Sequence, residues 1–144
     1  MLMYEAGSWP VRLQQIIDEF SEVDDSMERI EMLFEYAQEI DELPMSEWCD
    51  ETKVHGCQSE AHVLPMQNDD GTFHLMGASD AKLVQGLMAI TAIALEGLAP
   101  SEVAIFSSDY ASEMGLMNAL TPSRANGFRN MFRKVVLAAQ EMGE

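Results

Sequence analysis

The chain has 144 residues, of which 47% are hydrophobic, and its 25 acidic against 8 basic residues give a formal net charge of −17. Such a length and apolar content predict a single domain, residues 1–144, with residues 1–9 as a flexible N-terminus. The negative charge argues against nucleic acid or an anionic membrane as partner, no apolar run approaches the ~20 residues that span a bilayer, and the N-terminal residues do not resemble a secretory signal.

Two amphipathic helices are predicted first. Pro10 suits the first turn of one helix, and Asp25, followed by Glu28 at capping-box spacing, begins another that should end at Leu43–Pro44. Trp48 should anchor the irregular linker that follows. The apolar positions recur at helical spacing: Leu13, Ile16, Ile17 and Phe20, then Ile30, Leu33, Phe34, Ala37 and Ile40.

Three short strands are predicted next, at residues 52–54, 61–67 and 72–77. Pro65 has no N–H to donate, so the second strand should lie at a sheet edge or be irregular there. The residues 68–71, Asn-Asp-Asp-Gly, are typical of a hairpin turn.

Helices account for the rest of the chain. A nearly apolar helix at 81–98 should be central and buried, and its Gly86 indicates close approach of another backbone. Short helices should follow at 100–106 and 109–118, and a long one at 122–142. The order α-α-β-β-β-α-α-α-α predicts an α+β domain with a small three-stranded antiparallel sheet packed against helices.

The candidate chemistry lies in residues 53–62, which contain one of the two cysteines and two of the three histidines. Gly56 can adopt a positive φ and present Cys57 at the tip of a turn. Gln58 and Ser59 are polar, which indicates that Cys57 does not lie in the core. Two cysteines are too few for a disulfide framework, so a reducing, cytoplasmic location is expected.

The reactive form of a cysteine is its thiolate, which a nearby positive charge stabilises. His55 lies two residues before Cys57, and alternate side chains of an extended segment share a face. The second source of positive charge is the segment 124–134, which holds four of the eight basic residues.

Four interpretations are open on these residues alone. Cys57 could carry sulfur as a persulfide, by chemistry of the same type as thiol–disulfide exchange. Cys49, His55, Cys57 and His62 could bind zinc, although Cys-x5-His-x-Cys-x4-His is not a standard zinc spacing. Cys57 could be a redox sensor with Cys49 as the resolving thiol, or an incidental cysteine in an ordinary turn.

The acidity itself also has two interpretations. Exposed carboxylates with few lysines could reflect adaptation to high salt, or the chain could be an acidic cytoplasmic protein. Thermal unfolding in a salt series distinguishes them, because stability that falls as salt rises contradicts the first.

Three segments resemble the SufE-type sulfur-acceptor proteins, which include the CsdE branch. They are Val-His-Gly-Cys-Gln-Ser at 54–59, Gly-Ala-Ser-Asp-Ala at 77–81 with Val-Gln-Gly-Leu at 84–87, and Leu-Thr-Pro-Ser-Arg-Ala-Asn-Gly at 120–127. They occur in the family's order at compatible spacing, and the likeness covers residues 10–142. Three departures are Pro65, a surface far more acidic than expected of the family, and His62, which stands where many members carry an aromatic residue. His62 could be a surface substitution or an added base.

The resemblance implies that Cys57 accepts sulfur from the persulfide of a PLP-dependent cysteine desulfurase of the SufS or CsdA type. It further implies stimulation of that enzyme and delivery of sulfur to an iron–sulfur scaffold or another acceptor. The chain would then be an accessory protein and not an enzyme, with no cofactor or metal of its own and the pyridoxal phosphate on its partner. The implied fold is that of the IscU-type scaffolds.

The resemblance also assigns residues to the site. Gly56, Gln58 and Ser59 would present the cysteine. Arg124 matches the family's arginine near this loop, where it could stabilise the thiolate or persulfide or tie the start of the last helix to the loop. His55 is a candidate stabiliser of the thiolate from its spacing to Cys57 alone, not from the resemblance.

Overall fold

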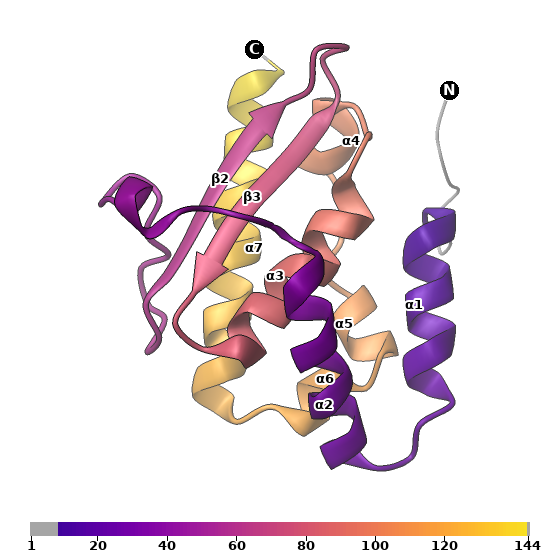
Figure 1. Cartoon of the computed structure of the whole chain (residues 1–144). Coiled ribbons are helices and arrows are strands. Elements are labelled where there is room, and N and C mark those ends of the chain that lie inside the picture. Colours follow the sequence, from indigo (N-terminus) through magenta and orange to yellow (C-terminus); the bar gives the residue numbers. More distant parts are fainter. Residues whose placement is uncertain (1–8, 144) are drawn as a thin grey trace.

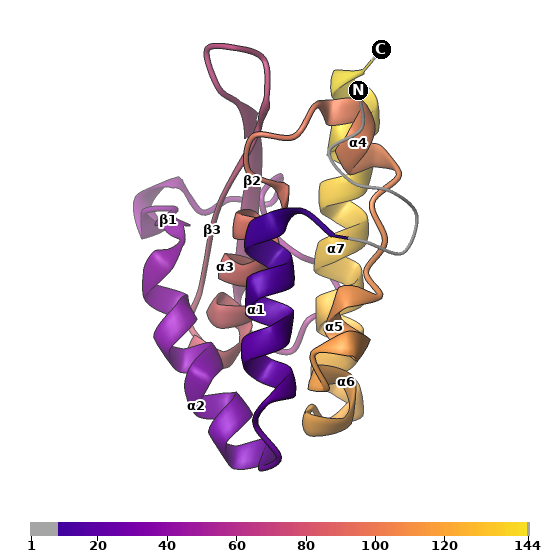
Figure 2. The ribbon, with the colours of Figure 1, turned by 90° about the vertical axis from the view of Figure 1, so that its right-hand side faces the viewer.

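The computed structural model describes residues 9–143 of the chain. A β-hairpin lies over a central helix, with the long C-terminal helix alongside it and two N-terminal helices on the opposite side (Figures 1 and 2). The helices are α1 (Val11–Ser21), α2 (Ser26–Tyr36), α3 (Lys82–Leu95), α4 (Pro100–Ala104), α5 (Tyr110–Glu113), α6 (Leu116–Ala119) and α7 (Pro122–Met142), and the strands are β1 (Asp41–Glu42), β2 (Ala61–Gln67) and β3 (Phe73–Ser79).

The first two helices begin where expected, but α2 ends early. Asp25 caps α2 by accepting a hydrogen bond from the Met27 amide, and the predicted apolar face of α1 is buried. The prediction that the second helix continues to Pro44 is wrong. The chain leaves the helix because Leu43 donates its amide to the Gly77 carbonyl at 3.1 Å, so sheet pairing replaces helical pairing. Phe34, expected in the core, remains 39% exposed.

The sheet is mixed and not purely antiparallel, which corrects the predicted sheet. Its strand order is β1-β3-β2, with β2 antiparallel and the two-residue β1 parallel to β3. The predicted strand at 52–54 forms only an isolated bridge, Lys53 to His62, beside β2. The α+β class with a three-stranded sheet packed on helices is confirmed.

Pro65 lies in an edge strand, as its missing N–H predicted. The backbones of Ala61 and Val63 point away from β3, because they bond to Val54 and Thr52. Alternate residues of a strand direct their backbone groups to the same side. The position at which Pro65 lacks an N–H therefore faces the open edge, and no hydrogen bond between β2 and β3 is lost.

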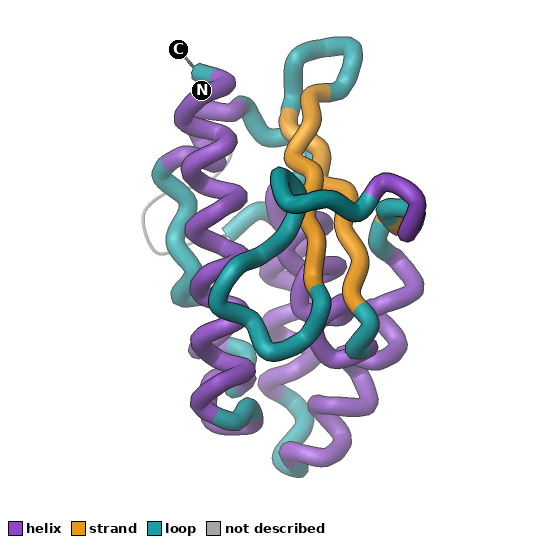
Figure 3. Tube along the Cα trace, turned by 90° about the vertical axis from the view of Figure 1, so that its left-hand side faces the viewer, coloured by secondary structure: helices purple, strands orange, loops and turns teal. Residues whose placement is uncertain are grey.

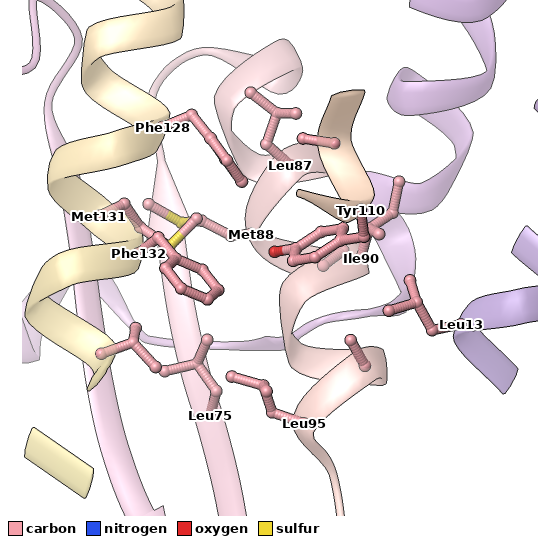
Figure 4. Close-up of a cluster of buried hydrophobic side chains, with 14 of the residues drawn as sticks. Leu13, Leu75, Leu87, Met88, Ile90, Leu95, Tyr110, Phe128, Met131 and Phe132 are labelled. Carbon is pink, nitrogen blue, oxygen red and sulfur yellow. The ribbon is translucent and has the colours of Figure 1, made fainter. Parts of the chain in front are cut away.

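The central helix α3 is largely buried and meets its neighbours closely. A Cβ on Gly86 would collide with the Leu33 carbonyl of α2, which confirms the predicted close approach. Tyr110 is fully buried among apolar side chains and bonds to the Thr91 hydroxyl at 2.7 Å (Figure 4). Burial raises the pKa of Tyr110 well above its usual value. The helix expected at 109–118 is divided into α5 and α6 at Gly115, whose φ is 77°.

Candidate functional site

The segment that carries Cys57 is a short loop with two fixed ends. Before it, the Val54 amide donates to the Ala61 carbonyl at 2.8 Å. After it, Glu60 exchanges hydrogen bonds with Asp80 in both directions, its amide donating to Oδ1 and its carbonyl accepting from the Asp80 amide, each at 3.1 Å. The loop between these ends, residues 55–59, is called the Cys57 loop below; it belongs to the long connection that passes beside α7 (Figure 3).

Gly56 turns the chain as the sequence predicted. Its φ of 83° lies in the left-handed region, where side chains with a Cβ are disfavoured. Asn130 of α7 donates its side-chain amide to the Gly56 carbonyl at 3.3 Å, and a Cβ on Gly56 would collide with that same Nδ2. Glycine is therefore required at 56 for its dihedral angle and for space.

Cys57 is a free, half-buried thiol that touches the core instead of standing clear of it. A Cβ placed on Gly127 of α7 would lie 3.0 Å from the Cys57 Sγ. That separation is tighter than an ordinary carbon–sulfur contact, so the thiol occupies space that only glycine leaves free. Gly127, which no sequence argument singled out as a site residue, thus shapes the site.

The start of α7 holds the other side of the Cys57 loop. The Thr121 hydroxyl caps the helix by accepting from the Arg124 amide at 3.4 Å. One residue before Arg124, the Ser123 hydroxyl donates to the Gln58 side-chain oxygen at 3.3 Å. Ser59 is half-buried between Gln58 and the fixed end at Glu60.

Arg124 lies three residues before Gly127 on α7, so the two are neighbours on the helix surface. Its Nη1 is buried and has no hydrogen-bond partner among residues 9–143. No hydrogen bond joins Arg124 to the Cys57 thiol within that range. The structure thus brings the predicted arginine to the helix turn that faces the thiol and leaves one of its donors available.

His55, the second predicted stabiliser of the thiolate, is placed differently. Its side chain is 66% exposed, and its Nε2 lies 3.6 Å from the Asp50 carboxylate. Within the described part of the chain, no hydrogen bond links it to Cys57.

His62 is neither a surface substitution nor a free base, because it is only 2% exposed. Its ring stacks on Trp48 with centroids 4.7 Å apart, which also confirms that Trp48 anchors the linker. Its two nitrogens lie 2.7 Å from the Glu60 carboxylate and 2.7 Å from the Thr52 hydroxyl. The hydrogen bond from His62, and after it the one from Lys53, holds the pKa of Glu60 below its usual value.

The proposed zinc ligands do not converge. No group of three or more His, Cys, Asp or Glu side chains in residues 9–143 is arranged to hold a metal ion. Both His62 nitrogens are engaged as described, and Cys49 is an exposed free thiol with its Sγ 3.8 Å from the Thr52 hydroxyl. Cys49 and Cys57 therefore contact different parts of the molecule.

Comparison with known proteins decides the family. The SufE family, described as an Fe-S metabolism associated domain, matches residues 14–139. The chain belongs to the SufE family. That family is associated with iron–sulfur metabolism, in agreement with the sequence resemblance.

Relatives described as SufE-like agree with this assignment, and a solved structure shares the fold. The chain is 36% identical over 132 residues to an uncharacterized SufE-like protein of Synechocystis sp., covering 92% of this chain and 82% of that one. It is 33% identical to another from Rhizobium meliloti, covering 89% and 94%. The fold matches the solution structure of a hypothetical protein from Thermus thermophilus with a TM-score of 0.77, at 22% identity and over 94% and 98% of the two chains. No helix among the described residues of this SufE protein is long and apolar enough to cross a membrane.

Proposed function

We propose that this SufE-family chain is a sulfur carrier that receives a sulfur atom on Cys57 from a PLP-dependent cysteine desulfurase, stimulates that enzyme and passes the sulfur to iron–sulfur assembly. The observation that carries the proposal is the position of Cys57, half-buried at Gly127 on a loop fixed at both ends. The pyridoxal phosphate belongs to the partner, and the setting is the reducing cytoplasm.

The transfer needs no oxidant or reductant. The Cys57 thiolate attacks the outer sulfur of the donor persulfide, a new S–S bond forms on Cys57, and the donor's S–S bond breaks. The donor cysteine leaves as a thiolate, and the proton of the persulfide travels with the transferred sulfur. Atoms, electrons and charge therefore balance between the two proteins.

Two features of the site support this chemistry. The absence of a side chain at Gly127 lets the thiol pack directly against the surface of α7. The unpartnered Nη1 of Arg124 is a donor that a thiolate or persulfide anion could engage after a small movement of the loop. Hydrogen bonds to a charged group are about twice as strong as neutral ones, so such a donor favours the anionic sulfur.

The test is to incubate the protein with a SufS- or CsdA-type desulfurase and L-cysteine and to measure the intact mass. We expect an added mass of one sulfur atom that is lost in Cys57→Ser and kept in Cys49→Ser. An adduct that forms at full level in Cys57→Ser would defeat the proposal.

The half-burial of Cys57 adds an expectation about accessibility. A thiol packed against α7 must move outward to meet a donor sulfur, and Gly56 permits that movement. Alkylation of Cys57 should therefore accelerate when a desulfurase that has been given no L-cysteine is added. Equal rates with and without the desulfurase would contradict this.

A further inference from the structure

A small basic pocket lies beside the Cys57 loop, on the surface of an otherwise strongly acidic protein. It has a volume of about 250 Å³ and is lined by Lys53, His55, Asn130, Arg133, Lys134 and Leu137. Three of the chain's 8 basic residues therefore line one pocket, whereas no acidic residue within 9–143 lines it.

The positive charge of the pocket is only partly neutralised by its surroundings. Lys53 pairs with Glu60 at 3.2 Å. Lys134 donates to the backbone carbonyl of Glu51 at 2.8 Å, which fixes its position without neutralising its charge. Arg133 is exposed, and its side chain makes no hydrogen bond or ion pair with any residue in 9–143. At least two cations thus remain available to an incoming anion.

The pocket is joined directly to the site of chemistry. Asn130 lines it and donates to the Gly56 carbonyl. Gly127, against which the Cys57 thiol packs, lies three residues earlier on α7, a rise of about 4.5 Å along the helix. A protein that brings its sulfur to Cys57 therefore arrives within about one helical turn of the pocket.

We propose that this pocket receives a carboxylate side chain from an acidic segment of the desulfurase, next to that enzyme's persulfide. This inference rests on the proposed function and adds to it the chemistry of the docking surface. The volume lies below the roughly 300–1,000 Å³ typical of small-molecule sites but accommodates one protein side chain.

Charge explains why such a pocket matters in this chain. A molecule with a net charge of −17 repels an acidic partner at long range. A local positive surface beside the thiol gives that partner one favourable orientation, and electrostatic complementarity acts mainly on association rate and specificity. The pocket thus selects the approach that brings the two sulfur atoms together.

The test measures persulfide formation on Cys57 as a function of carrier concentration, with a desulfurase and L-cysteine at low salt. Arg133→Glu should raise the half-saturating carrier concentration about tenfold. Placing like charges together costs at least ~1.4 kcal/mol of binding free energy, which corresponds to a tenfold loss of affinity. The maximal yield at saturation should be unchanged. Lys134→Gln, which keeps a donor but removes the charge, should produce a smaller rise.

Arg129→Glu is the matched control. Arg129 is an exposed residue of the same helix, bonds to Asn126 at 3.2 Å and does not line the pocket. The variant changes net charge by the same amount as Arg133→Glu, so it should shift the half-saturating concentration less than about twofold. Equal shifts in the two variants would overturn the proposal.

A second arm uses a low-molecular-weight anionic persulfide in place of the enzyme. Wild type and Arg133→Glu should react with it at the same rate, whereas an equal loss with both donors would show that the pocket binds a small anion instead of a partner carboxylate. If wild-type protein gains no sulfur from the desulfurase at any concentration, the proposed function itself fails, and the docking proposal fails with it. A shift confined to Arg133→Glu, with wild type fully competent, supports both.

Discussion

The turn at the far end of β2 offers an informative contrast with the Cys57 loop. Each contains a glycine with a positive φ, 83° at Gly56 and 87° at Gly71. The hairpin turn is closed by its own residues, since Asn68 and Thr72 bond across it at 2.7 Å and Asp70 accepts from Thr72.

The Cys57 loop depends on another element for its shape. Apart from the local turn at 55–56, it is held by α7, through Asn130, through Ser123 and through the contact at Gly127. The hairpin turn is therefore closed largely by its own residues, with one contact outside it from Asn68 to Glu96 at 3.0 Å. The loop that carries the thiol, in contrast, can be released by changes on a helix more than sixty residues away in sequence.

The largest expected difference between the two turns comes from alanine at their glycines. Gly71→Ala should cost about 1–2 kcal/mol of unfolding free energy, because alanine must adopt the left-handed conformation there. Its Cβ would meet no neighbouring atom among residues 9–143, so no steric cost is added. Gly56→Ala should cost about 1–3 kcal/mol more, since its Cβ also collides with Asn130. Chemical denaturation of the two variants gives both values.

Adding Asn130→Ala to each variant separates the two contributions. The extra cost at Gly56 should fall, because the collision is removed, and the cost at Gly71 should not change. Strict additivity at both positions would show that the collision with Asn130 adds nothing to the cost at Gly56.

The next effect concerns the contact between α7 and the thiol. Gly127→Ala places a methyl group 3.0 Å from the Cys57 Sγ, and such overpacking costs about 1–3 kcal/mol. Displacement of the loop should relieve that cost, so Cys57 alkylation should accelerate about five- to tenfold. The helix itself should gain slightly in stability, because alanine is the better helix former. An unchanged alkylation rate would show that the thiol accommodates the methyl group without moving.

A smaller effect is expected from the hydrogen bond at Gly56. Asn130→Ala removes one solvent-accessible bond, worth about 0.5 kcal/mol at the low end of the range, so Cys57 alkylation should rise about two- to threefold. Asn126→Ala is the control, because Asn126 is an exposed α7 residue whose side chain bonds to Arg129 and not to the loop. Equal acceleration in both variants would contradict a specific role for Asn130.

The smallest expected change in stability concerns a histidine in the hairpin. His74 of β3 lies 2.8 Å from the Asp41 carboxylate and 2.6 Å from that of Glu96, and these hydrogen bonds, Asp41 first, raise its pKa above the usual value near 6.5. A raised folded-state pKa stabilises the protein below the unfolded pKa, and the contribution is lost as pH rises through the folded pKa. His74→Gln should therefore reduce stability by a few tenths of a kcal/mol near pH 6 and have less effect near pH 9. Denaturation at both pH values measures this, and an equal loss at each would count against a charged His74.

The first and last helices and the turn at Gly56 were predictable from sequence because their signals are local. The spacing of Leu13, Ile16 and Phe20 and the proline at the start of α7 fix those elements without reference to the rest of the chain. The glycine before Cys57 likewise predicted the positive φ that the structure has at residue 56.

What could not be predicted depends on contacts between distant segments. The parallel strand β1 exists because Leu43 meets Gly77, and His62 is buried because Trp48 stacks on it. The role of Gly127 is visible only once α7 lies against the Cys57 loop. No periodicity or turn signal in the sequence predicts these contacts between distant segments.

The open edge of β2 has a consequence for how the protein behaves when it is concentrated. An exposed strand is a template on which a second chain can add its own strand, and sheets that grow in this way aggregate. Pro65 presents no donor at the position where such growth would begin, and the net charge of −17 keeps separate copies apart. The proline and the net charge therefore both oppose the addition of a second chain at this edge.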